Sequence, residues 1–360
     1  MDTPNFKVLV RCFTYNQSKY ITDSMNGFCM QQTDFPFICC IVDDASTDGE
    51  QEVIKQYVEA NFDFSEDSEA CSKETDYAYI TYACHKTNKN CYFAVLYLKE
   101  NHYSNPAKFA GKKREYLKEW VDVCIYEAMC EGDDYWIDPK KLQKQIDYLD
   151  NEPRCGLCFT DFNILYENDN YEEMNVLKTK QQKFPHEFTV EEWIKARTYV
   201  GPMTWVYRIS SMDHMPQLQG PDGTFVWFAY FLATSNVKCL LSDTTAVYRY
   251  CDSGVTHTKK ITVAYARSQG MLRLQLQLVD LYVSTRVEEL KTQLITDWCN
   301  GNIKWIYLCR DKDAQKMLGK QLNGLSTKNK VTYFLYKIVP CVLNGIYGKH
   351  LANKGYKEYK

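Results

Sequence analysis

The sequence predicts an α/β protein built on a doubly wound, mostly parallel sheet. Two strand–helix pairs open the chain: the apolar run Lys7–Phe13 precedes a helical pattern that includes Ile21 and Phe28, and Phe37–Val42 precedes one that includes Ile54. Short polar loops join these segments, and such alternation is typical of a parallel sheet with helices on its faces. Phe37–Val42 is apolar at every position, as expected of a strand covered on both sides.

Polar clusters follow both of these strands. Thr14–Ser18 comes directly after the first strand, and Asp43–Gly49 comes directly after the second. In sheets of this kind ligands bind beyond the carboxyl ends of the strands. We therefore expect the two clusters to converge on one crevice.

The next segments are expected to extend the sheet. Asn61–Lys73 is acidic and irregular and predicts a loop, whereas Tyr77–Ala83 and Cys91–Leu98 are rich in strand-forming residues and predict a hairpin-like pair. Lys112–Cys124 has apolar residues at helical spacing. It leads into the short apolar run Ile125–Cys130, which predicts a buried strand.

A cluster of three carboxylates, Glu131, Asp133 and Asp134, follows that strand within the segment Cys130–Trp136. Like charges packed so closely repel one another unless a cation lies among them, and hard divalent cations prefer oxygen ligands that they share with phosphates. Gly132 allows a sharp turn or the close approach of a ligand. The alternative is an acidic loop that is simply solvated.

After the acidic loop, Asp138 is expected to cap a helix whose buried stripe includes Leu142 and Ile146. Three further strands and one aromatic helix are expected before residue 260. The strands are Gly156–Thr160, Gly201–Tyr207, which is expected to open with a tight turn, and Ala246–Tyr250. The helix is Phe225–Leu232.

The character of the chain changes near residue 260, so we expect a first domain over residues 1–260 and a helical C-terminal region over residues 261–360. From Lys328 onward the chain is basic and aromatic. Such a tail can make a peripheral contact with an anionic membrane surface. It can equally pack back on the domain and expose a solvated lysine face.

Composition excludes several classes of protein. The net charge of −3 gives no support for nucleic-acid binding. The chain has no run of about 18 apolar residues, so no membrane span is predicted. The 16 cysteines are scattered, and Met1–Lys7 has no apolar signal core. We therefore expect reduced thiols in a cytoplasmic protein, at the inner face of the cell membrane if the tail binds there.

With these residues in place, the chain resembles the family-2 glycosyltransferases of the GT-A fold, particularly bacterial enzymes of surface-polysaccharide assembly, over about residues 6–257. Four short motifs in the right order carry the resemblance. They are Phe13-Thr14-Tyr15-Asn16, Val42-Asp43-Asp44-Ala45-Ser46-Thr47-Asp48, Cys130-Glu131-Gly132-Asp133-Asp134-Tyr135-Trp136 with Asp138-Pro139, and Ala246-Val247-Tyr248-Arg249 followed by Gly254-Val255.

The resemblance implies a role for each motif. Tyr15 would stack near the nucleotide base, the backbone at Thr14 would contact the base, and Asp44 would accept from the base or ribose. Asp133 would touch the ribose or the metal, and Asp134 would bind Mn²⁺ or Mg²⁺ bridging the donor diphosphate. Glu131 stands where many relatives carry an aspartate, and it is the second expected metal ligand.

An inverting transfer also needs a carboxylate that deprotonates the acceptor hydroxyl. Relatives place it after a glycine and before an aromatic helix, and here the order Gly220-Pro221-Asp222-Gly223 departs from that pattern by a residue or more. Asp222 is the candidate base, ahead of Asp213 and Asp243. Arg249 would steady the diphosphate or form a structural ion pair, and His257 would contact metal or phosphate or simply be exposed.

The function implied is transfer of a sugar from a nucleoside-diphosphate donor to a glycan or lipid-linked saccharide, and a UDP-sugar is the expected donor. A phosphoacceptor receiver domain is disfavoured because its acidic pair follows the first strand, whereas Asp43-Asp44 follows the second. A nucleotidyltransferase would have a glycine-rich loop where Thr14–Ser18 lies. A non-catalytic protein that binds sugar nucleotides or carbohydrate and retains the fold stays open, because Asp222 is displaced.

Overall fold

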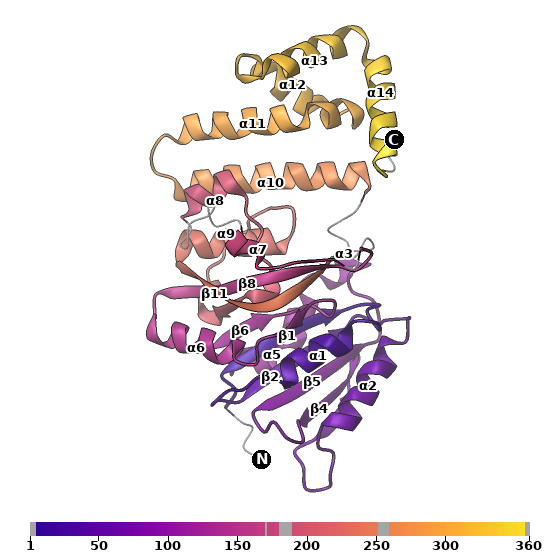
Figure 1. The fold of residues 1–360 in the computed structure, drawn as a ribbon, viewed down its shortest axis with the longest axis vertical. Helices are drawn as coiled ribbons and strands as arrows, with labels where there is room; N and C mark the ends of the chain where they lie inside the picture. Colours follow the sequence, from indigo (N-terminus) through magenta and orange to yellow (C-terminus); the bar gives the residue numbers. More distant parts are fainter. Residues whose placement is uncertain (1–4, 170, 180–188, 251–258, 357–360) are drawn as a thin grey trace. The chain divides into compact units, whose positions relative to one another are not determined.

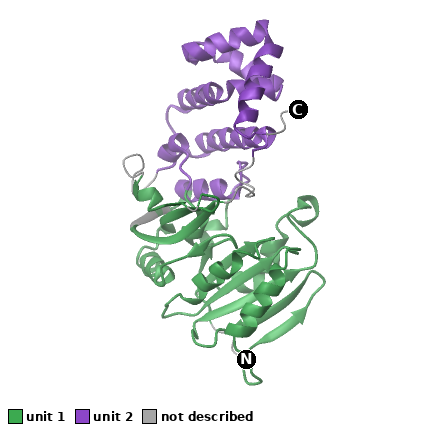
Figure 2. Cartoon of the chain, turned by 45° about the vertical axis from the view of Figure 1, so that its right-hand side comes forward, with its two compact units in different colours: residues 1–188, 200–215, 234–250 green, residues 189–199, 216–233, 251–360 purple. Residues whose placement is uncertain are grey.

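The structure is a computed structural model that describes residues 5–169, 171–179, 189–250 and 259–356. It consists of two compact units, which are coloured separately in Figure 2. Unit 1 comprises residues 1–188, 200–215 and 234–250, and unit 2 comprises residues 189–199, 216–233 and 251–360. The chain therefore passes between the units several times. A division into compact units does not show which parts of the chain fold independently. The expected domain boundary near residue 260 therefore stays a prediction.

Unit 1 is built on a mixed sheet whose centre is parallel, as the sequence predicts. The strand order is β3-β4-β5-β2-β1-β6-β10-β8-β11-β7, with β9 paired to β8. Parallel pairing joins β5, β2, β1 and β6. These strands are short and almost wholly buried, and their bounds are β1 Val8–Thr14, β2 Phe37–Asp43, β5 Cys91–Leu98 and β6 Tyr126–Met129.

The other strands flank this parallel centre. On one side, β4 pairs antiparallel with β5, which confirms the predicted hairpin, and β3 pairs antiparallel with β4. On the other side, β10 pairs antiparallel with β6, and the long strands β8 and β11 run parallel to each other. The bounds are β3 Cys71–Glu74, β4 Ala78–Cys84, β7 Tyr135–Trp136, β8 Cys155–Tyr166, β9 Tyr171–Glu173, β10 Val206–Arg208 and β11 Asn236–Tyr250.

Helices cover the sheet of unit 1. Figure 1 shows α1 and α2 beside each other against the parallel strands, and the Tyr57 hydroxyl of α2 donates to the Asn26 side chain of α1 (2.8 Å). Phe28 of α1 meets Trp136 edge to face, with ring centroids 5.0 Å apart. The helices are α1 Ile21–Cys29, α2 Glu50–Asn61, α3 Pro106–Phe109, α4 Lys112–Tyr116, α5 Lys118–Val121, α6 Lys141–Asn151 and α7 Val176–Thr179.

Three local predictions were wrong. The helix expected over Lys112–Cys124 is two short helices, because the chain turns at Leu117, which is fully buried. Asp138 does not cap α6: it lies in the turn before the helix, where its side chain accepts from the Lys140 N–H (2.8 Å). The loop expected over Asn61–Lys73 is interrupted at its end, where Cys71 to Lys73 belong to β3 and pair with β4. The strand expected over Gly201–Tyr207 does open with a tight turn, the 3-10 turn Pro202–Thr204.

Unit 2 is helical. Its helices are α8 Val190–Ala196, α9 Gly223–Thr234, α10 Ile261–Tyr282, α11 Val287–Leu308, α12 Lys312–Lys320, α13 Thr327–Ile338 and α14 Pro340–Asn353. Its core includes Trp193 of α8, Phe228 of α9 and Leu278 of α10. Within the described residues, every helix is too short or too polar to cross a membrane.

Candidate functional site

The loops that follow β1 and β2 are joined by hydrogen bonds. The Asp44 N–H donates to the Thr14 carbonyl (3.0 Å), and the Asn16 side chain accepts from the Thr47 N–H (2.8 Å). Asn16 also donates its own N–H to the Ser46 hydroxyl (2.9 Å) and has a φ of 53°, a left-handed conformation that asparagine tolerates. These bonds fix Tyr15 between the two loops with 44% of its surface exposed, so its ring is accessible to a flat ligand.

Beneath these loops lies Glu50, a residue that the sequence did not single out. Its carboxylate is fully buried and accepts from the Thr14 hydroxyl, the Gln17 N–H (2.8 Å) and the Ser46 hydroxyl (2.8 Å). Burial raises the pKa of Glu50, while these hydrogen bonds oppose the rise. Glu50 holds both loops from below. In the sequence it looks like any glutamate in the first turn of a helix.

Asp44, an expected nucleotide contact, is buried and supports a third segment. Its carboxylate accepts from the backbone N–H groups of His102 (2.9 Å) and Tyr103 (3.1 Å), and it pairs with Lys113 (3.0 Å). A carboxylate has about four lone-pair positions, so three donors leave little capacity for a fourth. Asp44 thus positions the chain at residues 101–103 beside the end of β1. Whether it also contacts a nucleotide stays a prediction.

The acidic loop lies against the end of β1. The Gly132 N–H donates to the Phe13 carbonyl (3.1 Å), and the Glu131 carboxylate accepts from the Phe13 N–H (3.1 Å). A Cβ atom on Gly132 would lie 2.3 Å from Thr14 Oγ1 and 2.7 Å from Thr14 Cβ. The absence of a side chain at Gly132 therefore lets the loop that carries Asp133 and Asp134 touch Thr14. Segments that follow β1, β2 and β6 meet at one place, as the sequence predicts.

Replacing Gly132 by alanine is expected to lower the free energy of unfolding by about 1–3 kcal/mol, the usual result of overpacking. The added methyl group would displace the Thr14 side chain, whose Cβ is fixed directly to the backbone of β1 and so cannot move away alone. The matched control is Gly301→Ala in α11, where nothing lies within 4 Å and alanine favours the helix. Denaturant unfolding should show opposite signs for the two variants, and equal effects would contradict the close contact at Thr14.

The electrostatics of the loop favour a bound cation. Burial raises the pKa of Asp133, and burial together with the neighbouring Asp133 charge raises the pKa of Asp134 well above its usual range. Asp134 is only 3% exposed. Ionising both groups is costly unless a cation accompanies them. Among the described residues no group of three His, Cys, Asp or Glu side chains is placed to hold a metal ion.

Glu131, the second expected metal ligand, lies differently from Asp134. Its carboxylate is bound to the Phe13 N–H and lies 3.9 Å from Arg11, which is buried and also pairs with Glu127 (2.8 Å). Burial raises the pKa of Glu131, and Arg11 opposes the rise. Its carboxylate thus has a protein partner already. A role for Glu131 as a metal ligand stays a prediction.

Arg249 forms structural ion pairs behind the acidic loop. Its guanidinium pairs with Glu167 (2.6 Å) and Asp23 (2.7 Å), and Nε donates to the Asp133 carbonyl (3.0 Å). Its backbone N–H donates to the Asp134 carboxylate (2.9 Å). Of the two roles considered for Arg249, these contacts support the structural one. Strand β11 therefore positions both aspartates, a contribution that short motifs do not reveal.

The candidate base, Asp222, lies in unit 2. Its carboxylate pairs with Arg267 of α10 and accepts from the Phe225 N–H (3.1 Å) at the start of α9. One quarter of its side-chain surface is exposed. The Asp222 carboxylate is therefore held by one guanidinium and one backbone N–H of unit 2.

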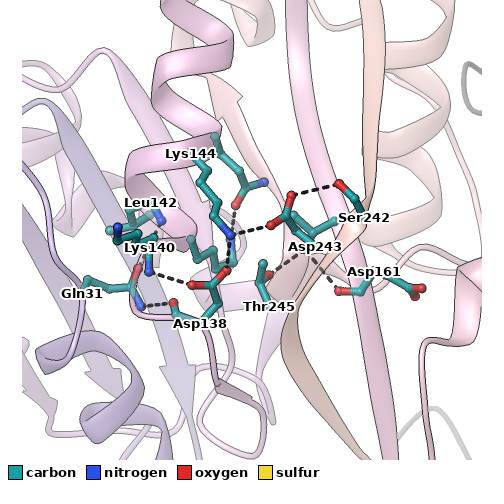
Figure 3. A network of polar contacts seen from close by, with 12 residues as sticks. Gln31, Asp138, Lys140, Leu142, Lys144, Asp161, Ser242, Asp243 and Thr245 are labelled. Atoms are coloured by element: carbon teal, nitrogen blue, oxygen red, sulfur yellow. Dashed lines mark hydrogen bonds and ion pairs between the residues drawn. The ribbon is translucent and has the colours of Figure 1, made fainter.

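The other aspartates considered as a base differ in their surroundings. Figure 3 shows Lys144 of α6 between Asp138 and Asp243, and its ammonium group lies 2.8 Å from the Asp138 carboxylate. Asp243 is therefore one half of a structural ion pair. Asp213 is exposed. His257 and Gly254-Val255, which were expected near the site, lie outside the described residues.

Comparisons with known proteins agree with this geometry. The sequence profile of glycosyl transferase family 2 matches residues 12–68, which include the end of β1, all of β2 and the loops that follow these strands. An uncharacterized protein, Rv1520, of Mycobacterium tuberculosis is 27% identical over 294 residues, 79% of this chain and 71% of the relative. TuaG of Bacillus subtilis, described as a putative teichuronic acid biosynthesis glycosyltransferase, is 23% identical over 266 residues, 71% of this chain and 84% of the relative.

Solved structures share the fold over nearly the whole chain. TarS of S. aureus, residues 1–349 in complex with UDP, aligns with a TM-score of 0.52 at 17% identity and covers 97% of this chain and 89% of that one. The mannosyltransferase PcManGT of Pyrobaculum calidifontis, in complex with GDP-Man and Mn²⁺, aligns with a TM-score of 0.50 at 12% identity and covers 99% and 84%. At such identities the likeness concerns the fold alone. The family profile over residues 12–68 and the relative TuaG make the chain similar to the family-2 glycosyltransferases, and the solved structures show that it shares the GT-A fold.

Proposed function

We propose that this glycosyltransferase moves a sugar, with inversion, from a nucleoside-diphosphate donor to a glycan or lipid-linked saccharide. The observation that carries the proposal is the meeting of three segments of unit 1: Thr14 and Tyr15 after β1, Asp44 after β2, and Gly132–Asp134 after β6. A nucleotide needs an aromatic or backbone surface for its base and a cationic or metal site for its diphosphate. Tyr15 and the Thr14 backbone offer the surface for the base. The carboxylates of the acidic loop offer a site for a metal that would bind the diphosphate.

In this proposal Tyr15 stacks on the base, the Thr14 backbone contacts it, and Asp44 fixes the base or ribose side of the pocket. Asp133 binds the ribose or the metal. A UDP-sugar is the donor that we propose, and a solved structure of the similarly folded TarS contains UDP. TuaG, whose name refers to teichuronic acid, supports a saccharide acceptor.

Asp134 is proposed to hold Mn²⁺ or Mg²⁺, with Glu131 as a second candidate ligand. The raised pKa values of Asp133 and Asp134 support this, and the PcManGT structure contains Mn²⁺. A divalent ion bound there would act as a Lewis acid that neutralises charge on the leaving diphosphate. Asp133 and Asp134 then serve to position the diphosphate, while Arg249 fixes their orientation.

Asp222 is the proposed general base. It would take the proton of the acceptor hydroxyl as the new glycosidic bond forms on the face opposite the leaving diphosphate. A non-catalytic binding protein is the alternative, and it would bind the donor without turning it over.

The proposal is tested by thermal unfolding of the full chain with a UDP-sugar, with and without Mn²⁺. A ligand that binds only the folded state at 100 times its Kd stabilises it by about 2.7 kcal/mol, so the UDP-sugar should raise Tm when Mn²⁺ is present. GDP-Man and the ion alone serve as comparisons. If no sugar nucleotide raises Tm with or without Mn²⁺, the proposed donor site is wrong.

The same experiment should depend on pH. Metal binding needs the ionised form of Asp134, and the pKa of this group is raised, so the Mn²⁺-dependent increase in Tm should keep growing as pH rises above the range in which an ordinary aspartate titrates. An aspartate of ordinary pKa, about 3.9, would be ionised above that range and would give no such growth. The diphosphate of a UDP-sugar has no titrating group here, so the donor itself does not produce the effect.

A further inference from the structure

The last two helices of unit 2 expose an apolar stripe. On α13 the residues Val331, Phe334, Leu335 and Ile338 recur at the spacing of one helical face, and Ile338 is 74% exposed. The stripe continues after the helix with the exposed Val339 and, on α14, Val342 and Ile346. Apolar residues at this spacing normally face a protein core. Here they face outward.

The opposite face of α13 explains this orientation. Tyr336 is buried and stacks on Tyr307 of α11, with ring centroids 3.9 Å apart and planes 6° from parallel. Thr332, one turn earlier, is buried on the same side. Tyr336 also lies 6.2 Å from the ring of Tyr347 on α14. The tyrosine face therefore packs within unit 2 and leaves the aliphatic face uncovered.

Charge around the stripe has a single sign. Residues 314–356 contain no Asp or Glu, although the whole chain has a net charge of −3, and they contain seven lysines: Lys316, Lys320, Lys328, Lys330, Lys337, Lys349 and Lys354. With about 3.6 residues per turn, Lys328 lies on one side of the α13 stripe and Lys330 and Lys337 lie on the other. Lys328 and Lys337 are exposed. The stripe and its lysines, which we call the α13–α14 face, form one amphipathic surface.

We propose that the α13–α14 face binds the surface of an anionic lipid bilayer. An apolar stripe flanked by lysines is the composition that lies in the interface between lipid head groups and acyl chains. A second copy of this chain is a poorer occupant, because two such faces would bring lysines of the same charge together. The proposal concerns unit 2 alone and does not rest on the identity of the sugar donor.

The test is sedimentation of the full chain with vesicles of phosphatidylcholine or of an equal mixture of phosphatidylcholine and phosphatidylglycerol. The chain should bind the anionic vesicles and not the neutral ones. Replacing Lys328, Lys330 and Lys337 together by glutamine should weaken binding about 100-fold, at about fivefold per lysine. Replacing all three by arginine should retain it.

The apolar stripe is tested by the double variant Phe334→Ser, Ile338→Ser, expected to weaken vesicle binding at least about tenfold. Both side chains are exposed, so the fold should tolerate the change, as an unchanged Tm would show. Leu281→Ser on α10 is the matched control, because Leu281 is 55% exposed and lies outside the α13–α14 face.

Three results would overturn the proposal. The first is an absence of binding to anionic vesicles. The second is binding that both the serine pair and the glutamine variants leave unchanged. The third is concentration-dependent self-association that the serine pair abolishes, since this would make a second copy the occupant.

Discussion

The variant Asp134→Asn is expected to lose at least about 100-fold in metal-dependent affinity for a UDP-sugar. A charged carboxylate is the ligand that a hard divalent ion requires, and neutral amide oxygen is a much weaker substitute in a site with few protein ligands. Asparagine keeps an oxygen that can accept from the Arg249 N–H, so the loop should retain its shape. Calorimetric titration with and without Mn²⁺ measures the effect.

Without metal, the same variant should be more stable than the wild type. The pKa of Asp134 is raised in the folded state, so its proton is favoured by folding, and its contribution to stability falls as pH rises through that pKa. Asparagine removes this loss. The variant should therefore exceed the wild type in free energy of unfolding by more at about pH 8 than at about pH 5.5. Denaturant unfolding in a chelator checks the sign.

Glu131→Gln is the comparison in the same loop. The Glu131 side chain already accepts from the Phe13 N–H, and glutamine can keep that bond. A loss of metal-dependent affinity equal to that of Asp134→Asn would establish Glu131 as a metal ligand. Retention of full donor affinity by Asp134→Asn would remove Asp134 from the proposed role.

The second large effect is expected for Asp222→Asn, which should bind donor normally and lose about 10²- to 10⁴-fold in turnover. Asparagine retains an oxygen for the Phe225 N–H, so the start of α9 is preserved while the basic charge is removed. Since the acceptor is unidentified, the measurement is hydrolysis of the UDP-sugar with Mn²⁺, in which water takes the place of the acceptor.

Two controls separate a base from a structural aspartate. Asp213→Asn and Asp243→Asn replace the other candidates and should leave hydrolysis within about twofold of the wild type if Asp222 is the base. Asp243 pairs with Lys144, so its loss should appear in the unfolding free energy instead. Hydrolysis at the wild-type rate by Asp222→Asn would place the base elsewhere.

The sequence was sufficient to predict the strands at the parallel centre of the sheet, because these strands are covered on both faces. β2 and β5 are buried at every position, so uninterrupted apolar runs marked them. The polar residues that end β1, β2 and β6 could then be placed at one edge by the rule for parallel strands. Gly132 signalled a close approach, and Thr14 is the group that it approaches.

Other parts of the site depend on contacts between distant segments, which periodicity does not encode. Glu50 and Arg249 are buried charges whose partners lie elsewhere in the chain, as with Arg249 and Asp23. The role of Asp44 in holding residues 101–103 has the same origin. In a sequence, a loop carboxylate that binds a ligand cannot be distinguished from one that accepts a hydrogen bond from a backbone N–H.

The interleaving of the two units limits how the chain can be divided for experiments. Unit 2 draws α8 and α9 from positions before residue 234, and the Gln275 side chain of α10 donates to the Ile194 carbonyl of α8. Gly270 of α10 lies so close to Gly220 that a Cβ there would be 3.0 Å from its backbone. A fragment that stops at residue 260 would lack α10. It would therefore leave Ile194, Gly220 and the nearby Trp193 without the helix that covers them. Fragments for expression should therefore keep α10 with the segments before it, and shorten the chain only beyond that helix.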